Sequence, residues 1–475
     1  NSEKAIALAD KNSRNILILD DKNNQANPEN VPYPSSPLSY TNTVRLGDSV
    51  SNLTGVIDFS YNRYRLLPTQ TPQFITTNNR TNEPELLQHG IFQTGTLKVA
   101  SFNVLNYFNG DGNGEGFPTA RGADTAEEFT RQSDKIVSAL VAMNADVVGL
   151  MEIENDGYST TSAISDLVAK LNMQMGENTY QFVKPDTATL GSDAIAVGLI
   201  YKPAKVALKG NAISTTQSPF DFGNRQPLVQ TFTEITSNES LTIAVNHFKS
   251  KGSCGSASGN NADAKDGQGC WNGLRTQAAD SLTAWLATLP AVSTDSDVLI
   301  IGDLNAYAKE DPILTIENKG YKNLIEKSLG YKAYSYSFAG ELGYLDHALA
   351  TDSLTKQVVD TAIWHINADE PRSFDYNTEF KSSAQLSSYY GSDAYRASDH
   401  DPIVISFALS STKKLIGDFD NDGDVDRNDL IAFTRLLRKG EVDNINYDFN
   451  NDGLVNTRDV RALMALCTHS RCAVN

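Results

Sequence analysis

The 475-residue chain is poor in cysteine, histidine and positive charge, and it has no long apolar run. Its four cysteines show no CxxC spacing, which argues against structural zinc. Lysine and arginine number 40 against 58 acidic residues, a formal net charge of -18, which argues against bulk electrostatic attraction to nucleic acid or anionic membranes. No apolar run approaches the roughly 20 residues of a membrane-spanning helix, so no membrane span is expected.

The four cysteines form two local pairs along the chain, Cys254 with Cys270 and Cys467 with Cys472. Three connectivities are possible, and local pairing is the simplest. A disulfide across the polar segment 255–261 would restrain it and would imply an oxidising compartment; buried or free thiols are the alternative. The chain starts at Asn1 with neither Met nor an apolar leader, so we expect either a removed signal peptide or a fragment.

Composition and periodicity divide the chain into three regions, which we take as domains: 1–92, 97–409 and 411–475. The first alternates short β-like runs with Asn/Pro/Ser turns and is typical of a small β module. The second alternates strands with helices, which predicts a layered sheet-and-helix domain. The expected strands are 16–19, 50–59, 64–67, 97–104, 146–151, 194–201, 241–247, 298–301 and 403–407, and the expected helix is 125–143.

The third region contains one acidic twelve-residue segment twice, and each copy leads into a helical pattern. Calcium loops of this length supply oxygen ligands from positions 1, 3, 5, 7, 9 and 12 and turn at a glycine in position 6, where Gly423 and Gly453 stand. The expected ligands are Asp418, Asp420, Asp422, the Asp424 carbonyl, Asp426 and Asp429 in the first copy, and Asp448, Asn450, Asp452, the Leu454 carbonyl, Asn456 and Asp459 in the second.

Aspartate at position 12, with no helix before either loop, resembles the dockerin type I repeat rather than a full EF-hand. Dockerins as a family bind cohesin modules on other proteins, so the resemblance implies two bound Ca²⁺ and a cohesin-like partner. A calcium-stabilised end cap without a partner, or a solvated acidic surface, is the alternative.

Polar residues end or interrupt the buried strands of the second region. Asp303 and Asn305 are two positions apart, as are His247 and Lys249, so each pair is expected on one face of an extended chain. The residues concerned are Asn103, Glu152, His247, Asp303, Asn305, Asp346, Asp399 and His400.

These residue types match the needs of phosphodiester hydrolysis. The reaction requires a divalent cation on hard oxygen ligands, an oriented water and a stabilised leaving oxygen. A buried carboxylate also needs a cation or a histidine beside it, because an unpaired buried charge is costly. Each residue alone has another interpretation, as a turn cap or a satisfied core histidine, but together they predict a metal-dependent phosphodiesterase site.

The strings that carry these residues are SFNVLN, LMEIEN, DAIAVGLIYKP, NRQPLV, VNHFKS, GDLNAY, YLDHAL and SDHDP. In this order they resemble the motifs of the endonuclease/exonuclease/phosphatase family, whose fold is shared by DNase I and exonuclease III-type enzymes. The chain is also similar to the secreted bacterial nucleases of that family, which carry an OB-like β segment upstream. The resemblance implies an α+β fold: a DNase I-like four-layer α/β sandwich, preceded by an OB-like segment and followed by the α-helical calcium module.

The resemblance implies a role for each polar residue of the site. Glu152 and Asn103 would bind Mg²⁺ or Mn²⁺, with Asp399 nearby as a further carboxylate on the metal side. Asp303 and Asn305 would orient the nucleophilic water and a phosphate oxygen.

The two histidines are expected to work with carboxylate partners. The resemblance implies that His400 acts in acid–base chemistry and is oriented by Asp346, and that His247 is the second histidine with Asp193 as its partner. A histidine held by a carboxylate has a fixed tautomer and a raised pKa, which suits proton transfer near neutrality.

Basic residues near the site are expected to hold the substrate backbone. The resemblance implies this for Arg225, and we add Lys249 and Lys251 on charge grounds. DNase I-like enzymes often have arginine two residues after the metal glutamate, where this chain has Glu154. This departure and the 254–270 insertion leave DNA or RNA, and single or double strands, open.

The sequence therefore predicts a secreted, monomeric, Mg²⁺-dependent endonuclease that hydrolyses extracellular DNA, with RNA as a further substrate. One alternative is a phosphatase or a phospholipase C of the sphingomyelinase type with the same fold. The other alternative is an inactive scaffold tethered by its calcium module.

Overall fold

The computed structural model describes residues 3–34, 37–85, 97–409, 417–419, 425–439, 447–450, 452–468 and 472–474. The chain divides into two compact units, residues 1–409 and 410–475. Three of the expected calcium ligands, Asp420, Asp422 and Asp424, lie outside the described residues. None of the helices in the described ranges combines the length and the apolar character that crossing a membrane requires.

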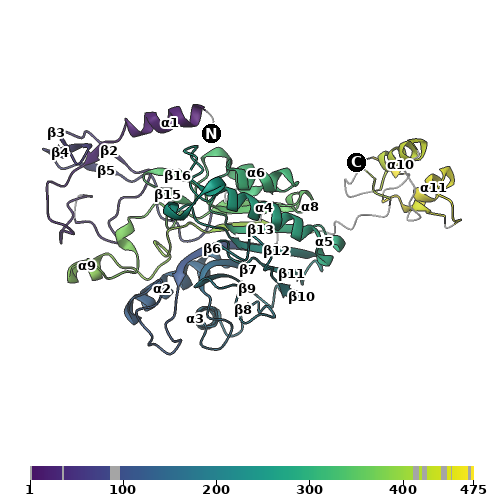
Figure 1. Ribbon diagram of the computed structural model, residues 1–475, viewed down its shortest axis with the longest axis horizontal. Coiled ribbons are helices and arrows are strands. Elements are labelled where there is room, and N and C mark those ends of the chain that lie inside the picture. The colour runs from purple at the N-terminus through teal and green to yellow at the C-terminus, as the bar shows by residue number, and fades with distance from the viewer. Residues whose placement is uncertain are drawn as a thin grey trace. The chain divides into compact units, whose positions relative to one another are not determined.

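Two six-stranded sheets form the centre of the first unit (Figure 1). Each has one parallel central pair, β6 with β7 and β12 with β13, among antiparallel neighbours. The first sheet has the order β18 (Val358–Ile363), β19 (Ile403–Phe407), β6 (Leu97–Tyr107), β7 (Val147–Glu154), β9 (Ile195–Tyr201) and β8 (Gln181–Phe182). The second has the order β10 (Val206–Ile213), β11 (Leu228–Glu234), β12 (Ser240–His247), β13 (Val298–Asp303), β17 (Asp346–Ala350) and β14 (Lys322–Asn323).

Alternating side chains of β13 show how the two apolar cores arise. Leu299 and Ile301 belong to the core shared by both sheets, whereas Val298 and Ile300 belong to a second core on the outer face of the second sheet. Successive residues of a strand point to opposite faces. Asp303 has the parity of Leu299 and Ile301, so its carboxylate lies on the inter-sheet side where the strand ends.

Helices cover the outer face of each sheet and complete four layers. α2 (Ala126–Met143) begins at Thr125, whose side chain accepts a hydrogen bond from the Glu128 N–H, and it packs with α3 (Ala163–Met175) on the first sheet. α4 (Asn272–Ala287) and α6 (Asp311–Asn318) pack on the second. The shorter elements are α5 (Pro290–Thr294), α7 (Leu324–Leu329), α8 (Asp352–Thr355), α9 (Ser383–Ser388), β15 (Tyr336–Phe338) and β16 (Glu341–Gly343).

Gly149 on β7 marks a close approach of the two sheets. A Cβ added there would lie 2.6 Å from Ile301 Cδ1 and 2.9 Å from Val245 Cγ2. Gly149→Ala is expected to lower the free energy of unfolding by about 1–3 kcal/mol, because buried neighbours must shift, and chemical unfolding measures this. Gly255→Ala is the matched control, since a Cβ there meets nothing within 4 Å; equal stability of the two variants would contradict this packing.

The N-terminal region differs from the prediction. Asn52 takes a positive φ of 52°, which divides the expected strand 50–59 in two, and a helix that was not predicted precedes the strands. The described strands form a three-stranded sheet, β1-β4-β3, and a separate pair, β2-β5. The five-stranded barrel of an OB fold is therefore not confirmed. The elements are α1 (Glu3–Ser13), β1 (Ile18–Leu19), β2 (Ser49–Ser51), β3 (Gly55–Ser60), β4 (Arg63–Pro68) and β5 (Gln73–Ile75).

The second unit contains the two helices that the acidic repeat predicts. α10 (Arg427–Lys439) and α11 (Thr457–Leu463) each begin within the last positions of one twelve-residue segment. Phe433 and Leu463 are fully buried in its small core.

Both predicted local disulfides are present, Cys254–Cys270 and Cys467–Cys472. The first closes the long loop after β12. Arg275 is fully buried beneath this loop and donates hydrogen bonds to the carbonyls of Lys249, Cys270 and Gln268. The disulfide and the hydrogen bonds of the buried guanidinium together fix the conformation of this polar loop.

Candidate active site

The candidate site lies where the ends of strands from both sheets meet. β6 and β7 run parallel, as do β12 and β13, so each pair presents the side chains at its carboxyl ends together. β17 begins at the same edge, because Asp346 pairs with Asp303 in the ladder. The segment 398–402 leads into β19 opposite β6. Residues that are far apart in the sequence are therefore neighbours in space.

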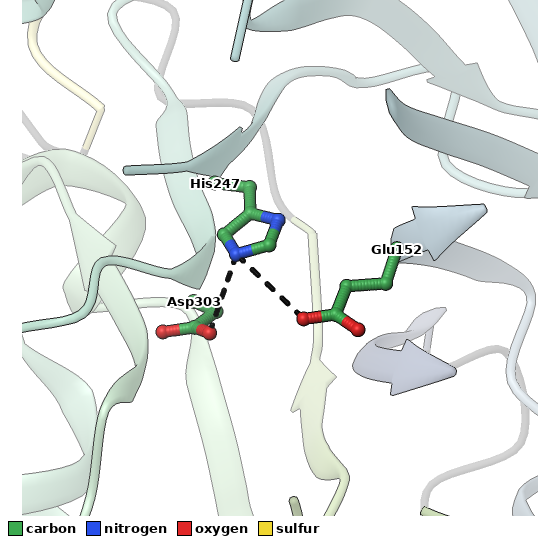
Figure 2. A group of neighbouring side chains, drawn as sticks. All are labelled: Glu152, His247 and Asp303. Atoms are coloured by element: carbon green, nitrogen blue, oxygen red, sulfur yellow. Dashed lines mark ion pairs between the residues drawn. The ribbon is translucent and has the colours of Figure 1, made fainter. Parts of the chain in front are cut away.

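Glu152, His247 and Asp303 form the centre of the site (Figure 2). His247 Nε2 lies 3.5 Å from Asp303 Oδ2 and 3.9 Å from Glu152 Oε1. His247 and Asp303 are buried, while Glu152 is partly exposed. Three donor atoms from β7, β12 and β13 all lie within 4.8 Å of one another, close enough for one metal ion to contact all three.

Asn103 and the backbone after β6 hold Glu152 in place. Asn103 Nδ2 lies 3.2 Å from Glu152 Oε1 and 3.5 Å from Asp303 Oδ2, and its Oδ1 accepts from the Leu105 N–H. The Asn106 N–H donates to Glu152 Oε2 at 3.1 Å. Glu152 also has a φ of 65°, a region that non-glycine residues rarely adopt and that is common at functional sites.

His400 forms the predicted pair with Asp346. Its Nδ1–H donates to Asp346 Oδ2 at 2.8 Å, which leaves Nε2 facing Asp303 Oδ2 at 3.9 Å. Two further contacts were not predicted: Ser335 Oγ donates to Asp346 Oδ2 at 2.6 Å, and the Tyr336 ring lies 4.6 Å from the His400 ring. Neither residue belongs to a recognisable motif, so no sequence pattern could have indicated them.

Burial and neighbouring charge shift the two histidines in opposite directions. For His247, burial and the positive charge of Arg225 hold the pKa well below its ordinary value. For His400, burial also disfavours the charged form, but the carboxylates of Asp346 and Asp399 outweigh it and raise the pKa well above its ordinary value. Two imidazoles with different proton affinities therefore flank the central carboxylate, the arrangement that separates acid and base roles.

The donor set matches a hard divalent cation. Burial raises the pKa of Asp303 to about 7, and burial with the nearby charge of Asp399 raises that of Glu152. These carboxylates lack sufficient positive charge around them, and a bound dication would supply it. Asn103 turns its amide nitrogen toward Glu152, so coordination through Oδ1 would need the amide to rotate.

Two expectations about parity carried the alternation of a strand past the end of that strand. β12 ends at His247 and β13 ends at Asp303. Asn305 lies beyond its strand with a φ of 49°, and its Nδ2 donates to the Phe248 carbonyl at 3.1 Å. Asn305 is thus buried beside the site, but it does not share a strand face with Asp303. Lys249 likewise lies beyond its strand, because β12 ends at His247.

Two expected partners are also corrected. Asp193 binds Arg225 at 3.1 Å and Arg121 at 3.0 Å, while His247 Nδ1 is buried with no hydrogen-bond partner in the described part of the chain; the expected Asp193–His247 pair is absent there. The Lys251 ammonium lies 2.6 Å from Glu310 Oε2, so this charge is neutralised within the protein and is not available for a phosphate.

The remaining basic residues surround a cavity of about 760 Å³ next to the site. Arg121, Arg225 and Lys249 line it together with Asp193, which pairs with both arginines, and Asp221. The Arg225 N–H donates to the His247 carbonyl at 3.2 Å. Arg121 was missed because the Gly-rich loop that carries it shows no periodicity or motif. The cavity places cations beside the carboxylate group, as binding of an anionic substrate requires.

His347 shows that a histidine inside a motif string need not be catalytic. It is fully buried, its Nε2–H donates to the Ala306 carbonyl at 2.7 Å, and burial lowers its pKa to about 4. Because the folded pKa lies below the unfolded value of about 6.5, stability is complete above pH 6.5 and falls as the pH drops toward 4. We expect His347 to account for a loss of about 2 kcal/mol at pH 5.

His347→Gln tests this, since glutamine keeps a donor for the Ala306 carbonyl and does not titrate. Urea unfolding of the first unit between pH 7.5 and 4.5 should show a flatter pH dependence in the variant than in the parent. Parallel curves would assign the acid sensitivity to other groups.

Two family models match this chain. The model of the "Endonuclease/Exonuclease/phosphatase family" matches residues 100–400, and that of a "Domain of unknown function (DUF8508)" matches residues 2–79. Among solved structures, the human nocturnin catalytic domain with bound sulfate is 14% identical, with a TM-score of 0.42 over 67% of this chain and 97% of that chain. A mannosyl-6-phosphatase from Bacteroides thetaiotaomicron is 13% identical, with a TM-score of 0.43 over 66% of this chain and all of that chain, 100%.

Curated relatives match only over short stretches. A long-isoform ulvan lyase of Alteromonas sp. (strain LOR) is 52% identical over 61 residues, which is 13% of this chain and 6% of the lyase. The corresponding lyase of Glaciecola sp. (strain KUL10) is 41% identical over 91 residues, 19% of this chain and 9% of the lyase. Such matches cover too little of either protein to identify the whole. The family model covers most of the chain and spans every polar residue of the site, and the chain belongs to the endonuclease/exonuclease/phosphatase family.

Proposed function

We propose that this member of a phosphoesterase family is a secreted, divalent-metal-dependent nuclease that cleaves phosphodiester bonds within DNA, and also within RNA. The observation that carries the proposal is the convergence of Asn103, Glu152, His247, Asp303 and the Asp346–His400 pair at one edge of the two sheets. In the adjacent cavity the cations of Arg121, Arg225 and Lys249 outnumber the carboxylates of Asp193 and Asp221, which favours a polyanionic substrate despite the negative charge of the whole chain.

The side chains divide the chemistry among them. A divalent cation held by Glu152, with Asn103 and Asp399 beside it, would neutralise charge on the phosphoryl oxygens. Asp303 accepts hydrogen bonds and would orient the attacking water. His400, held by Asp346 through Nδ1, keeps Nε2 free to exchange a proton with the reacting oxygens.

Digestion of supercoiled plasmid tests the proposal. The full chain is expected to nick and linearise plasmid with Mg²⁺ or Mn²⁺ and to lose the activity in excess EDTA. Parallel assays on RNA, sphingomyelin and p-nitrophenyl phosphate determine the substrate class. Cleavage of only the phospholipid or only the phosphomonoester would overturn the nuclease proposal in favour of a lipase or phosphatase of the same fold.

We further propose that the two acidic loops of the second unit bind Ca²⁺. Asp426 is 1% exposed, and its Oδ2 has no hydrogen-bond partner among the described residues. In the second loop, Asp459 is fully buried and accepts from the Asn450 and Asn456 N–H groups, which folds the loop around its acidic side chains. A calcium ion would compensate such buried carboxylate oxygen atoms.

Isothermal titration with CaCl₂ tests the loops. Two Ca²⁺ per chain are expected, and one each in the variants Asp426→Ala and Asp459→Ala. A cohesin-like partner would then bind the calcium-loaded form in preference to the chelated one. Unchanged stoichiometry in both variants would contradict the assignment.

A further inference from the structure

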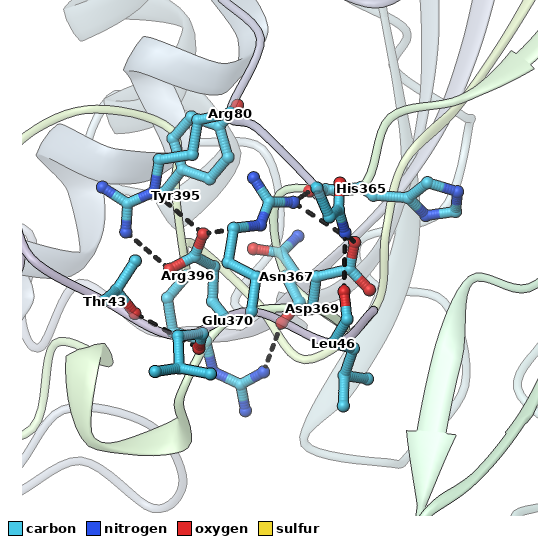
Figure 3. Close-up of polar contacts among 12 residues, drawn as sticks. Thr43, Leu46, Arg80, His365, Asn367, Asp369, Glu370, Tyr395 and Arg396 are labelled. Carbon is cyan, nitrogen blue, oxygen red and sulfur yellow. Dashed lines mark hydrogen bonds and ion pairs between the residues drawn. The ribbon is translucent and has the colours of Figure 1, made fainter. Parts of the chain in front are cut away.

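An arginine clasp, made of Arg45, Arg80, Asp369 and Glu370, joins the N-terminal region to residues 97–409 within the first unit. Figure 3 shows Arg80, Asp369 and Glu370 of this clasp. Arg80 Nη2 and Nε lie 2.5 and 2.9 Å from the Glu370 carboxylate, and Arg45 Nη2 lies 3.2 Å from Asp369 Oδ2. Both carboxylate side chains are completely buried. Buried charges need their partners in good geometry, so the clasp fixes the N-terminal region against the loop that carries Asp369 and Glu370.

The same loop holds the segment that carries His400. Asn367 Nδ2 donates to the His400 carbonyl at 2.6 Å, and the Ser398 N–H donates to Asn367 Oδ1 at 3.0 Å. Asp401 accepts from the Asn367 N–H at 2.7 Å and from His365 Nδ1 at 2.9 Å. The clasp is therefore separated from the candidate active site by a few residues of one hydrogen-bonded loop.

A cavity of about 680 Å³ opens between the N-terminal region and the loop that carries Asp369 and Glu370. Residues 44–46 of the N-terminal region line one side of it. Two other lining residues contact the candidate site directly: the Asn106 N–H donates to Glu152, and the Tyr336 ring packs on His400. The cavity thus continues the site toward the N-terminal region, away from the cavity that Arg121 and Arg225 line.

Charge in this cavity favours an anionic ligand. Four carboxylates line it. Asp369 and Glu370 are neutralised by the arginines of the clasp, and Asp375 lies 2.8 Å from Lys381 Nζ. The fourth, Asp399, is the carboxylate expected on the metal side. Arg396 also lines the cavity, with its Nη1 on the Asn367 carbonyl and its Nε lacking a hydrogen-bond partner in the described ranges. Arg372 is exposed at the rim, and no ion pair of its side chain occurs among the described residues.

Aromatic rings complete the lining. Phe338 is 65% exposed and Tyr336 is partly exposed, while Tyr376, which also lines the cavity, is buried. Exposed rings beside cationic groups are the usual means of holding single-stranded nucleic acid, because each base has a face that can stack.

We propose that this cavity is a subsite for the polynucleotide strand next to the scissile phosphate, with one wall supplied by residues 44–46 of the N-terminal region. The inference rests on the proposed nuclease function. A phosphate lies against Arg372 and Arg396, and a base stacks on the aromatic wall. The N-terminal region, which matches a domain family without a known function, is then part of the substrate site.

Two pairs of matched variants of the full chain test the subsite. Arg372→Gln removes a cation at the rim, and Arg63→Gln makes the same change at an exposed position of β4 that does not line the cavity. Leu46→Glu places a negative charge in the N-terminal wall, and Ile57→Glu places one on an exposed position of β3 outside it. Kinetics are measured on a single-stranded oligonucleotide and on bis(p-nitrophenyl) phosphate, a phosphodiester with no neighbouring nucleotide.

Arg372→Gln and Leu46→Glu are each expected to raise KM for the oligonucleotide about five- to tenfold, with kcat and hydrolysis of the small diester unchanged. Arg372→Gln should also reduce the slope of log KM against log salt by about 0.7, the value for one lost phosphate contact to a single strand. The two control variants should match the parent chain.

The subsite is wrong if both cavity variants keep the parent KM and salt slope, or if they lose activity equally on both substrates. A parent chain that cleaves neither substrate would instead reject the proposed function, so the two failures are distinguishable.

Discussion

Replacing His400 with alanine is expected to lower kcat for plasmid cleavage by about 10²- to 10⁴-fold, the usual contribution of a positioned acid–base group. His400 is buried, it is held by Asp346 at 2.8 Å, and its Nε2 faces the central carboxylate. Removing the ring would delete the group that we propose exchanges the proton, while Glu152 and the other proposed metal-side donors stay in place. Single-turnover nicking rates at saturating Mg²⁺ measure the effect.

His365→Ala is the matched control for this change. His365 also donates Nδ1–H to a buried carboxylate, Asp401 at 2.9 Å, but it is one-third exposed and stacks on Tyr334. It lies outside the group of converging donors, so its loss should reduce kcat less than about tenfold. Asp346→Asn should lie between the two, because an amide can still orient the ring but cannot stabilise its charged form. Equal rates for the two histidine variants would show that His400 takes no part in catalysis.

Local motifs predicted which residues come together at the site, because the ends of the buried strands position them. The Asp346–His400 bond and the approach of Asn103, Glu152, His247 and Asp303 are all present. Most of these side chains lie at a strand end or just outside one, and Asn103 lies within β6 where its regular pairing with β7 stops. In each case a short string carries both the apolar run and the polar residue. The roles assigned to these residues remain predictions that the kinetics above would test.

Predictions that extended the alternation of side chains beyond the strand ends failed for a physical reason. Alternation of side chains holds only while the backbone stays extended, and Asn305, with its positive φ, lies past the end of β13. The Asp193–His247 and Lys251–phosphate expectations failed because the sequence does not show that Arg121 or Glu310 competes for the same charge. A single sequence contains no signal for such long-range ion pairs.

The clasp is the clearest example of a structural feature that a single sequence does not indicate. Arg80 and Glu370 are separated by 290 positions, and neither lies in a motif. The sequence predicted only a small β module for the N-terminal region, whereas residues 44–46 line a cavity next to the candidate site. A layered sheet-and-helix domain could be predicted from alternating strands and helices, but the attachment of the N-terminal region could not.

Breaking the clasp is expected to give the largest loss of stability: Arg80→Ala should lower the free energy of unfolding of the first unit by about 3–5 kcal/mol. Arg80 binds both oxygens of Glu370 at 2.5 and 2.9 Å, and the carboxylate is inaccessible to water. Arg80 also lies 4.5 Å from the centres of the Tyr40 and Tyr395 rings. Its removal leaves a buried carboxylate whose remaining ion pair within the described residues is with Arg45, 3.3 Å away.

Two further variants separate a buried charge effect from a general loss of contacts. Arg14→Ala breaks an exposed pair with Asp10 of similar length, 2.6 Å, and should cost less than about 1 kcal/mol. Adding Glu370→Gln to Arg80→Ala removes the uncompensated charge and should recover part of the lost stability. If urea unfolding gave the same midpoint for Arg80→Ala and Arg14→Ala, the clasp would be a surface contact, and the N-terminal wall of the cavity would have no rigid support.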